Sequence, residues 1–197
     1  KSGDSFGQSV AVDGDLVVAG APNHDLPAEE VINGTERRTC VDCGAAYVFR
    51  RLGDFWVEEA KLAAPRSAFA QPRFGGALAA EDGRVLVGPY RGNCGLGSNV
   101  CALLLTLTQQ GWREEARLIP ADDRDGRYRF GAAVAFDGDR AIVGATSQGC
   151  SEVLPCGKVY VFQRAGANWS QRALFPGNMQ GQVAGFGSFV ALQGDWA

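Results

Sequence analysis

The chain lacks several features that whole classes of protein require. It has one histidine, His24, so a Ser or Cys nucleophile could find an imidazole base only there. No run of Lys or Arg is longer than a pair and the formal net charge is −3, which excludes the basic surface that binds nucleic acid or an anionic membrane. Apolar runs such as residues 102–105 are far shorter than the roughly 20 residues that cross a bilayer. We therefore expect no catalytic triad, no nucleic-acid partner and no membrane insertion in this stretch.

Glycine is abundant instead, and it belongs to an internal repeat. The dipeptide Phe-Gly recurs at spacings of 68, 56 and 56 residues, at Phe6-Gly7, Phe74-Gly75, Phe130-Gly131 and Phe186-Gly187. A turn pair follows each time, at Asp13-Gly14, Asp82-Gly83, Asp137-Gly138 and Gln193-Gly194. A Gly-Ala-Pro-like element comes next, at Gly20-Ala21-Pro22, Gly88-Pro89 and Gly144-Ala145. Each full repeat ends in a segment with one tryptophan, at Trp56, Trp112 and Trp169.

One repeat predicts a four-stranded antiparallel meander. An Asp-Gly pair between two apolar runs is a strong hairpin signal. The second run of each repeat, such as 16–19, is continuously apolar, so we expect it to be buried on both faces. The tryptophan segment 56–62 mixes charged and apolar residues, which suits an exposed outer strand. We therefore predict an all-β chain with one sheet per repeat, and such sheets stack radially as propeller blades.

The repeated Phe-Gly-x-Ser-Val-Ala, Asp-Gly-Asp, Val-Ala-Gly-Ala-Pro and Ala-Tyr-Val-Phe elements of the first repeat resemble the FG-GAP repeat. That resemblance implies blades of the kind found in the seven-bladed heads of integrin α-subunits and in other surface proteins. We expect about three and a half blades of a seven-bladed ring: blade 1 over 1–69 with a long loop, blade 2 over 70–125, blade 3 over 126–181 and the start of blade 4 over 182–197. Because these blades alone cannot close such a ring, we expect continuity with further blades of a larger chain. The alternative is a small ring completed by association of copies.

The six cysteines fall into one local pair per repeat, Cys40 with Cys43, Cys94 with Cys101, and Cys150 with Cys156. The second member precedes the expected end of the third strand by six residues each time, which predicts disulfides at equivalent positions in the blades. A disulfide framework indicates an oxidising, extracellular compartment. The alternatives for Cys40-x-x-Cys43 are half of a zinc site or a redox-active pair, but zinc would need a second pair nearby. Asn33-Gly34-Thr35 and Asn168-Trp169-Ser170 are N-glycosylation sequons, so Asn33 and Asn168 are candidate glycan sites.

Catalytic, cofactor and metal sites are not expected. Integrin-type repeats often carry an Asp-x-Asp-x-Asp-Gly calcium loop, but the shortened turns here hold too few carboxylates to cage calcium, which needs six to eight oxygen ligands. The acidic segment 121–126 has the wrong spacing for a calcium loop and is interpreted as a solvated connection. His24 is expected to be solvent-exposed. The adjacent acids of Glu58-Glu59 and Glu114-Glu115 are expected to point to opposite faces of a strand, so neither pair can act on one bond.

These observations predict an extracellular module that binds a protein or glycan partner, supports adhesion or helps to build an assembly at a cell surface. The expected contact surface consists of the variable loops after the second strand of each blade, 23–39, 91–100 and 146–155. One alternative is the non-catalytic propeller of a larger secreted or surface enzyme. Another is a calcium-binding adhesion receptor, which the shortened turns oppose.

Overall fold

The computed structural model describes residues 3–26, 40–63, 73–95, 98–122, 128–146, 157–177 and 185–194. Within these ranges the chain forms twelve β-strands and no helix. The strands are β1 (Val10–Asp13), β2 (Leu16–Ala21), β3 (Ala45–Leu52), β4 (Phe55–Ala63), β5 (Ala77–Glu81), β6 (Arg84–Gly95), β7 (Ser98–Thr108), β8 (Gly111–Leu118), β9 (Arg129–Asp137), β10 (Arg140–Thr146), β11 (Gly157–Ala165) and β12 (Asn168–Pro176).

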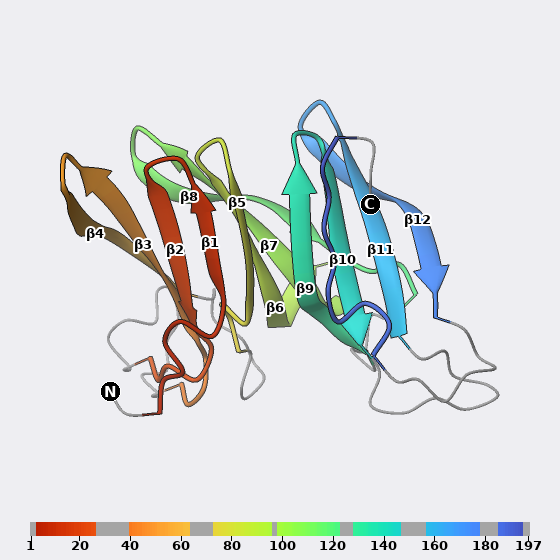
Figure 1. Cartoon of the computed structure of the whole chain (residues 1–197). Helices are drawn as coiled ribbons and strands as arrows, with labels where there is room; N and C mark the ends of the chain where they lie inside the picture. Colours follow the sequence, from red (N-terminus) through yellow and green to blue (C-terminus); the bar gives the residue numbers. More distant parts are fainter. Residues whose placement is uncertain are drawn as a thin grey trace.

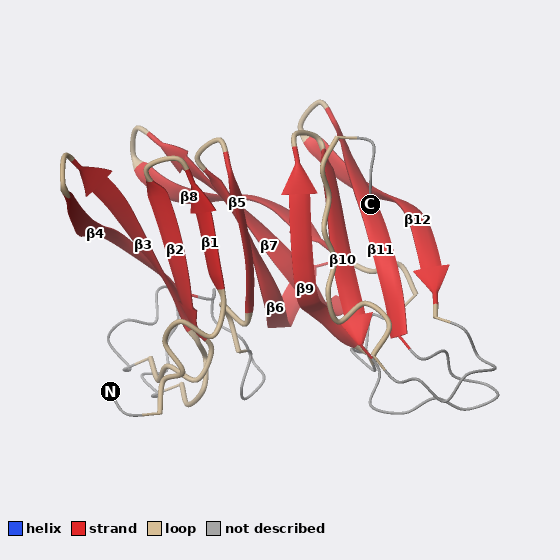
Figure 2. Cartoon of the chain, in the orientation of Figure 1, coloured by secondary structure: helices blue, strands red, loops and turns tan. Residues whose placement is uncertain are grey.

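The strands form three four-stranded antiparallel sheets in chain order, β1 to β4, β5 to β8 and β9 to β12. The sheets stand side by side, and in each sheet a short turn joins the first strand to the second and another joins the third strand to the fourth (Figures 1 and 2). The prediction of an all-β fold built from four-stranded propeller blades is confirmed. Residues 185–194 follow the third sheet and carry the fourth Phe-Gly. The seven-bladed ring stays a prediction.

We call the turn between the first and second strands of a sheet its inner turn, and the turn between the third and fourth strands its outer turn. The inner turns of the first and third sheets lie one residue later than we predicted. Asp13 pairs with Leu16, so Asp13 ends β1 and the two-residue turn is Gly14-Asp15. The third sheet repeats this arrangement, whereas the second sheet turns at Asp82-Gly83 as expected. Gly14 has a φ of 55°, which favours glycine at the first turn position of a II′-type hairpin. Strand register therefore makes Glu81, and not Asp82, the equivalent of Asp13.

The core lies between the sheets. One apolar cluster joins the first sheet to the second and contains Leu16, Val18, Ala46, Val48, Leu62, Phe74, Val85, Val87 and Leu103, among others. A second cluster joins the second sheet to the third and includes Leu86, Leu104, Leu118, Phe130, Phe136, Tyr160 and Phe162. The second strand of each sheet is largely buried, as the continuous apolar runs predicted, and β10 is buried from Ala141 to Ala145. By contrast, β4 is largely exposed, as expected of an outer strand.

Candidate binding face and the contacts between blades

The loops that we expected to bind a partner leave the second strand of each sheet at the end opposite the β1–β2 type of turn (Figure 1). The expected second loop, 91–100, is mostly strand instead, because β6 continues to Gly95 and β7 begins at Ser98. The base of the first loop is closed by two backbone hydrogen bonds between Leu26 and Cys40, of 3.0 and 2.8 Å. Cys40 also reaches disulfide distance of Cys43, with their Cα atoms 5.5 Å apart. Val41 is exposed between these two cysteines. Residues 27–39, with Asn33, lie outside the described residues. The residues on either side of that segment, Leu26 and Cys40, are hydrogen-bonded to each other.

A segment before β1 also supports this loop base. His24 Nδ1 lies 2.6 Å from Asp4 Oδ2, and the Asn23 side chain donates to Ser5 Oγ at 2.9 Å. The hydrogen bond with His24 holds the pKa of Asp4 below its ordinary value. The expectation that His24 is solvent-exposed is wrong, since only 14% of its side chain is accessible. The reason is a contact between residues 20 positions apart, which loop composition cannot reveal.

The same loop base is tied to the second sheet. The Arg73 amide donates to the Asp42 carbonyl at 3.2 Å, and the Phe74 amide donates to the Cys43 carbonyl at 3.0 Å. Gly44 and Phe74 form a parallel bridge. The base of the first loop is therefore anchored by two blades.

The second cysteine pair also reaches disulfide distance, with the Cα atoms of Cys94 and Cys101 6.0 Å apart. Cys101 pairs with Tyr90 across β6 and β7, so the link joins the strands near their loop ends. This pair does not occupy the position of the first pair. The strand register makes Leu105 the equivalent of Phe49. Cys101 lies four residues before Leu105, whereas Cys43 lies six residues before Phe49. The prediction of equivalent disulfide positions is therefore wrong for this blade. Cys150 and Cys156 lie outside the described residues.

The Phe-Gly and Gly-Ala-Pro elements meet between blades. The backbone of Gly20 packs against that of Gly75 in the next sheet, and Gly144 packs likewise against Gly187. A Cβ atom on either first glycine would overlap the carbonyl oxygen of its partner, and a Cβ on Gly88 would lie 2.5 Å from that of Gly131. The Gly-Ala-Pro element and the Phe-Gly pair therefore each need their glycine, because the backbones of two neighbouring blades approach each other closely at these residues.

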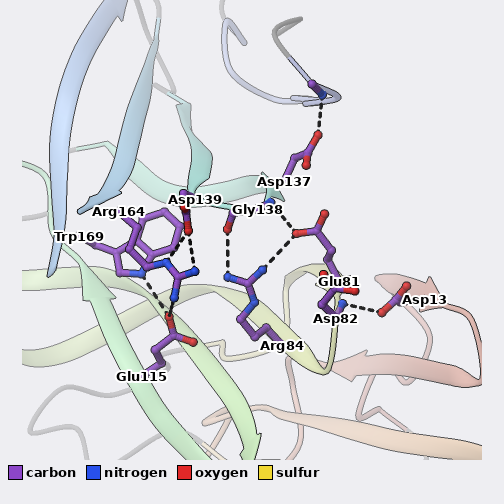
Figure 3. A network of polar contacts seen from close by, with 11 residues as sticks. Asp13, Glu81, Asp82, Arg84, Glu115, Asp137, Gly138, Asp139, Arg164 and Trp169 are labelled. Atoms are coloured by element: carbon purple, nitrogen blue, oxygen red, sulfur yellow. Dashed lines mark hydrogen bonds and ion pairs between the residues drawn. The ribbon is translucent and has the colours of Figure 1, made fainter. Parts of the chain in front are cut away.

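A second contact repeats along the inner turns (Figure 3). The carboxylate that ends the first strand of one blade accepts a hydrogen bond from the first turn amide of the next blade. The three bonds run from the Asp82 amide to Asp13 at 2.7 Å, from the Gly138 amide to Glu81 at 2.7 Å, and from the Gly194 amide to Asp137 at 2.5 Å. Arg84 strengthens the second bond, since it donates to the Gly138 carbonyl at 2.9 Å. The carboxylates that end the first strands therefore join neighbouring blades.

A third contact repeats along the outer strands, where each sheet has a β-bulge. At each bulge one residue of the outer strand has no partner on the neighbouring strand. These residues are Glu59 in β4, Glu115 in β8 and Arg172 in β12. Trp112 Nε1 donates to Glu59 Oε1 at 3.0 Å, and Trp169 Nε1 donates to Glu115 Oε1 at 3.4 Å (the second pair is drawn in Figure 3). A bulge redirects a side chain, and here it directs an acid to the tryptophan of the next blade. Sequence reasoning missed these acceptors, although the spacing Trp-x-x-Glu occurs in two repeats.

Charge pairing within a blade follows the same repeat. Arg51 pairs with Asp15 at 2.6 Å in the first sheet, and Arg164 pairs with Asp139 at 2.6 Å in the third. The second sheet has Leu107 and Gly83 at the equivalent positions, so it lacks both the arginine and the aspartate of this ion pair. These pairs hold the inner turn against the third strand.

The described residues hold no group of three or more His, Cys, Asp or Glu side chains that could bind a metal. Asp122, from the acidic segment, forms an ion pair of 2.6 Å with Lys158, whereas residues 123–126 are not described. A cavity of about 700 Å³ opens on the turn side between β5, β9 and residues 191–193. The two carboxylates in its wall, Glu81 and Asp137, already accept the backbone hydrogen bonds described above. No helix in the described ranges is long and apolar enough to cross a membrane.

The second sequon is accessible. Asn168 is the first residue of β12 and is exposed, as is Ser170, which lies on the same face of the strand. Trp169 points the other way and packs against the cluster between the second and third sheets. A glycan on Asn168 would therefore leave the joint between blades undisturbed.

Comparison with known families agrees with this geometry. A model of the FG-GAP repeat matches residues 1–49 and 112–162, which is about half of the chain. The first match spans β1 to most of β3, and the second includes β9, β10 and most of β11. No curated protein sequence matches the chain.

Proposed function

Because the chain belongs to the FG-GAP repeat family, we propose that it is an extracellular binding module that engages a protein or glycan partner through its loop face. Propeller modules of this kind often serve in binding or adhesion. The proposed role is not catalytic and requires no cofactor. The single observation that supports this assignment best is the clamped base of the first loop, where Leu26, Cys40 and Cys43 are held together.

A clamped base matters for binding because it lowers the entropy lost when a loop is immobilised by a partner. Two backbone hydrogen bonds and a disulfide restrain the segment 27–39 at its ends, and the His24–Asp4 contact supports the base from the side. The Cys94–Cys101 pair restrains the corresponding end of the second blade. Loops presented in this way from a rigid sheet are typical positions for recognition.

The proposed compartment rests on the same cysteines. Two cysteine pairs at disulfide distance suit an oxidising environment outside the cell. We also propose that Asn33 and Asn168 carry N-linked glycans when the protein is secreted by a eukaryotic cell. Intact-mass measurement before and after glycosidase treatment tests this, with Asn168→Gln and Ser170→Ala each expected to remove one glycan. A secreted protein with an unmodified Asn168 would contradict the assignment.

The test of the binding role replaces the loop while it keeps the clamp. Leu26 must stay, since it is only 2% exposed and bonds to Cys40, so the replacement covers 27–39 with a two-residue Asn-Gly turn. Binding is measured on panels of glycans and of secreted and cell-surface proteins. The matched control changes the exposed pair Gln109 and Gln110 to alanine at an outer turn on the opposite side.

We expect the loop variant to keep its thermal unfolding temperature and to lose the interactions seen with the native chain. The control variant keeps them. Binding that survives loop replacement, or that disappears in the Gln109 and Gln110 variant, would show that the loop face is not the contact surface.

A further inference from the structure

Each of the three described sheets has an Asp-Gly pair at or beside its inner turn, and these pairs are Asp13-Gly14, Asp82-Gly83 and Asp137-Gly138. In such a pair the backbone nitrogen of the glycine can attack the side-chain carboxyl carbon of the aspartate and close a five-membered succinimide ring. Glycine favours the attack because it has no side chain to hinder the approach. The reaction therefore depends on whether the carboxyl group and the glycine amide are able to reach each other.

The pair in the third sheet is restrained at both reacting groups (Figure 3). The Asp137 carboxylate accepts a hydrogen bond of 2.5 Å from the Gly194 amide, and the Gly138 amide donates to Glu81 at 2.7 Å. Arg84 also donates to the Gly138 carbonyl, at 2.9 Å. The carboxylate and the amide must both leave these partners before they can react with each other.

The pair in the first sheet is restrained at its carboxylate. Asp13 accepts a hydrogen bond of 2.7 Å from the Asp82 amide of the next blade. Asp13 is also the last residue of β1 and pairs with Leu16, so the sheet fixes its backbone. A hydrogen bond between blades therefore keeps this aspartate away from the glycine that follows it.

The pair in the second sheet lacks these restraints. Its inner turn consists of Asp82 and Gly83 themselves, with φ values of 49° and 68°, and Glu81 replaces the aspartate in the contact with the next blade. Asp82 is exposed, and its carboxylate has no hydrogen bond or ion pair within the part of the chain that the structure describes. The Gly83 amide has no partner there either, although the Gly83 carbonyl accepts from the Leu107 amide. Both reacting groups are therefore available.

We propose that Asp82-Gly83 is a site of covalent modification, at which aspartate isomerises to isoaspartate without an enzyme. The Gly83 nitrogen forms a bond to Asp82 Cγ, the bond from Cγ to its hydroxyl oxygen breaks, and the amide proton leaves with that hydroxyl as water. Water then opens the ring. If it adds to the backbone carbonyl carbon of Asp82, the bond from that carbon to the Gly83 nitrogen breaks, and Gly83 stays attached through Cγ as isoaspartate. Addition at Cγ restores aspartate, so water is the only other reactant.

The modified turn lies on a contact between the first two blades. Isoaspartate adds one carbon atom to the backbone between the Asp82 and Gly83 nitrogens, so the turn no longer matches the two-residue hairpin that pairs Glu81 with Arg84. It also converts the Asp82 carbonyl into a carboxylate, next to the amide that donates to the Asp13 carboxylate. Two like charges then share one site. We therefore expect the modification to break the hydrogen bond from Asp82 to Asp13.

Two tryptic peptides of the native chain compare the unrestrained pair with the restrained one. Residues 74–84 and 130–140 both follow an arginine, begin with Phe-Gly, contain one Asp-Gly pair and end in arginine. The folded protein is incubated in warm, neutral buffer and digested at intervals. Liquid chromatography separates the isoaspartyl form of each peptide, and electron-transfer fragmentation identifies it. Because the readout is for single peptides, Asp125-Gly126, which lies outside the described residues, does not contribute.

Isoaspartate is expected to form in 74–84 at least about tenfold faster than in 130–140, because the hydrogen bonds of Asp137 and Gly138 must break before that pair reacts. In guanidinium chloride, where both pairs lack those bonds, the two rates are expected to be similar. Asp82→Glu should nearly abolish the reaction in 74–84, because a larger ring would have to close. Equal rates in the folded protein, or a faster reaction in 130–140, would overturn the proposal.

A variant tests whether the hydrogen bond to Glu81 protects the third sheet. Glu81→Ala removes the acceptor of the Gly138 amide and should raise the rate in 130–140. The matched control Ser9→Ala, which removes a hydrogen bond to the second sheet elsewhere, should leave that rate unchanged. A rate in 130–140 that Glu81→Ala does not raise, or that Ser9→Ala raises equally, would overturn the assignment.

Hydrogen exchange of the Asp82 amide tests the effect on the blades. In incubated protein, this amide should lose its protection in proportion to the isoaspartate found in 74–84. An Asp82 amide that stays protected in the isomerised molecules would overturn the proposed effect on the contact between blades. None of these readouts uses a ligand of the loop face, so failure here leaves the proposed binding function untouched.

Discussion

The contact between Gly20 and Gly75 provides the sharpest test of how the repeat motif joins blades. A methyl group at residue 20 would overlap the Gly75 carbonyl oxygen and lie 3.0 Å from its carbonyl carbon. The neighbour is backbone of another sheet, so relief requires the whole second sheet to shift. Overpacking of this kind costs about 3 kcal/mol, at the upper end of the usual range.

The same methyl group would displace the Ser9 hydroxyl, which donates to the Gly75 carbonyl at 2.6 Å. Loss of that hydrogen bond adds about 1 kcal/mol. Gly20→Ala should therefore lower the free energy of unfolding by about 4 kcal/mol, and for a chain of this size the midpoint of thermal unfolding by roughly 8 to 16 °C. Urea and thermal denaturation followed by circular dichroism measure both quantities.

Two controls separate the causes. Ser9→Ala removes only the hydrogen bond and should cost about 1 kcal/mol. Gly53→Ala places a methyl group in open space at an outer turn with a φ of 63°, so it carries only the backbone strain of about 1 to 2 kcal/mol. If Gly20→Ala destabilised the protein no more than Gly53→Ala, the close approach of the two backbones would be refuted.

Two further predictions concern charge and covalent linkage. The hydrogen bond from Arg50 holds the pKa of Glu59 below its ordinary value of 4.5, so its stabilising effect is complete above that pH and is lost as the pH falls through the lower, folded-state pKa. Glu59→Gln should lower the free energy of unfolding by about 1 kcal/mol at pH 7 and by less at pH 3. The control Glu58→Gln, at the exposed neighbour, should change the free energy of unfolding little. Equal effects of the two substitutions at pH 7 would contradict this prediction. Replacing Cys94 and Cys101 together by serine should lower the free energy of unfolding by about 2 kcal/mol, and a protein whose urea midpoint is the same with and without reducing agent would disprove the link.

Much of the fold could be predicted from the sequence because its signals are local. Alternating turns and apolar runs identify the strands, and a pattern repeated three times determines that each repeat is one sheet. The turn at Gly14-Asp15 was missed by one residue, because both Asp-Gly and Gly-Asp suit a two-residue hairpin and only strand pairing decides between them.

The contacts between blades could not be predicted in the same way, because they join residues that are 29 or more positions apart. The repeated spacing Trp-x-x-Glu marks Glu59, but it does not indicate that a bulge turns this side chain toward Trp112. The burial of His24 likewise depends on Asp4, which lies before the first strand. The reason why two glycines recur in each repeat also became visible only when the sheets were placed together.

The joining of blades through their inner turns is tested most directly by native-state hydrogen exchange at the Asp82 and Gly138 amides. Turn amides at the surface ordinarily exchange fast, as we expect for Gly53 and Gly166 at the outer turns. We predict that the Asp82 and Gly138 amides exchange about tenfold or more slowly than those controls, and that Asp13→Ala removes the protection of Asp82 alone. Exchange of both amides as fast as the outer-turn controls would contradict the joined arrangement of the blades.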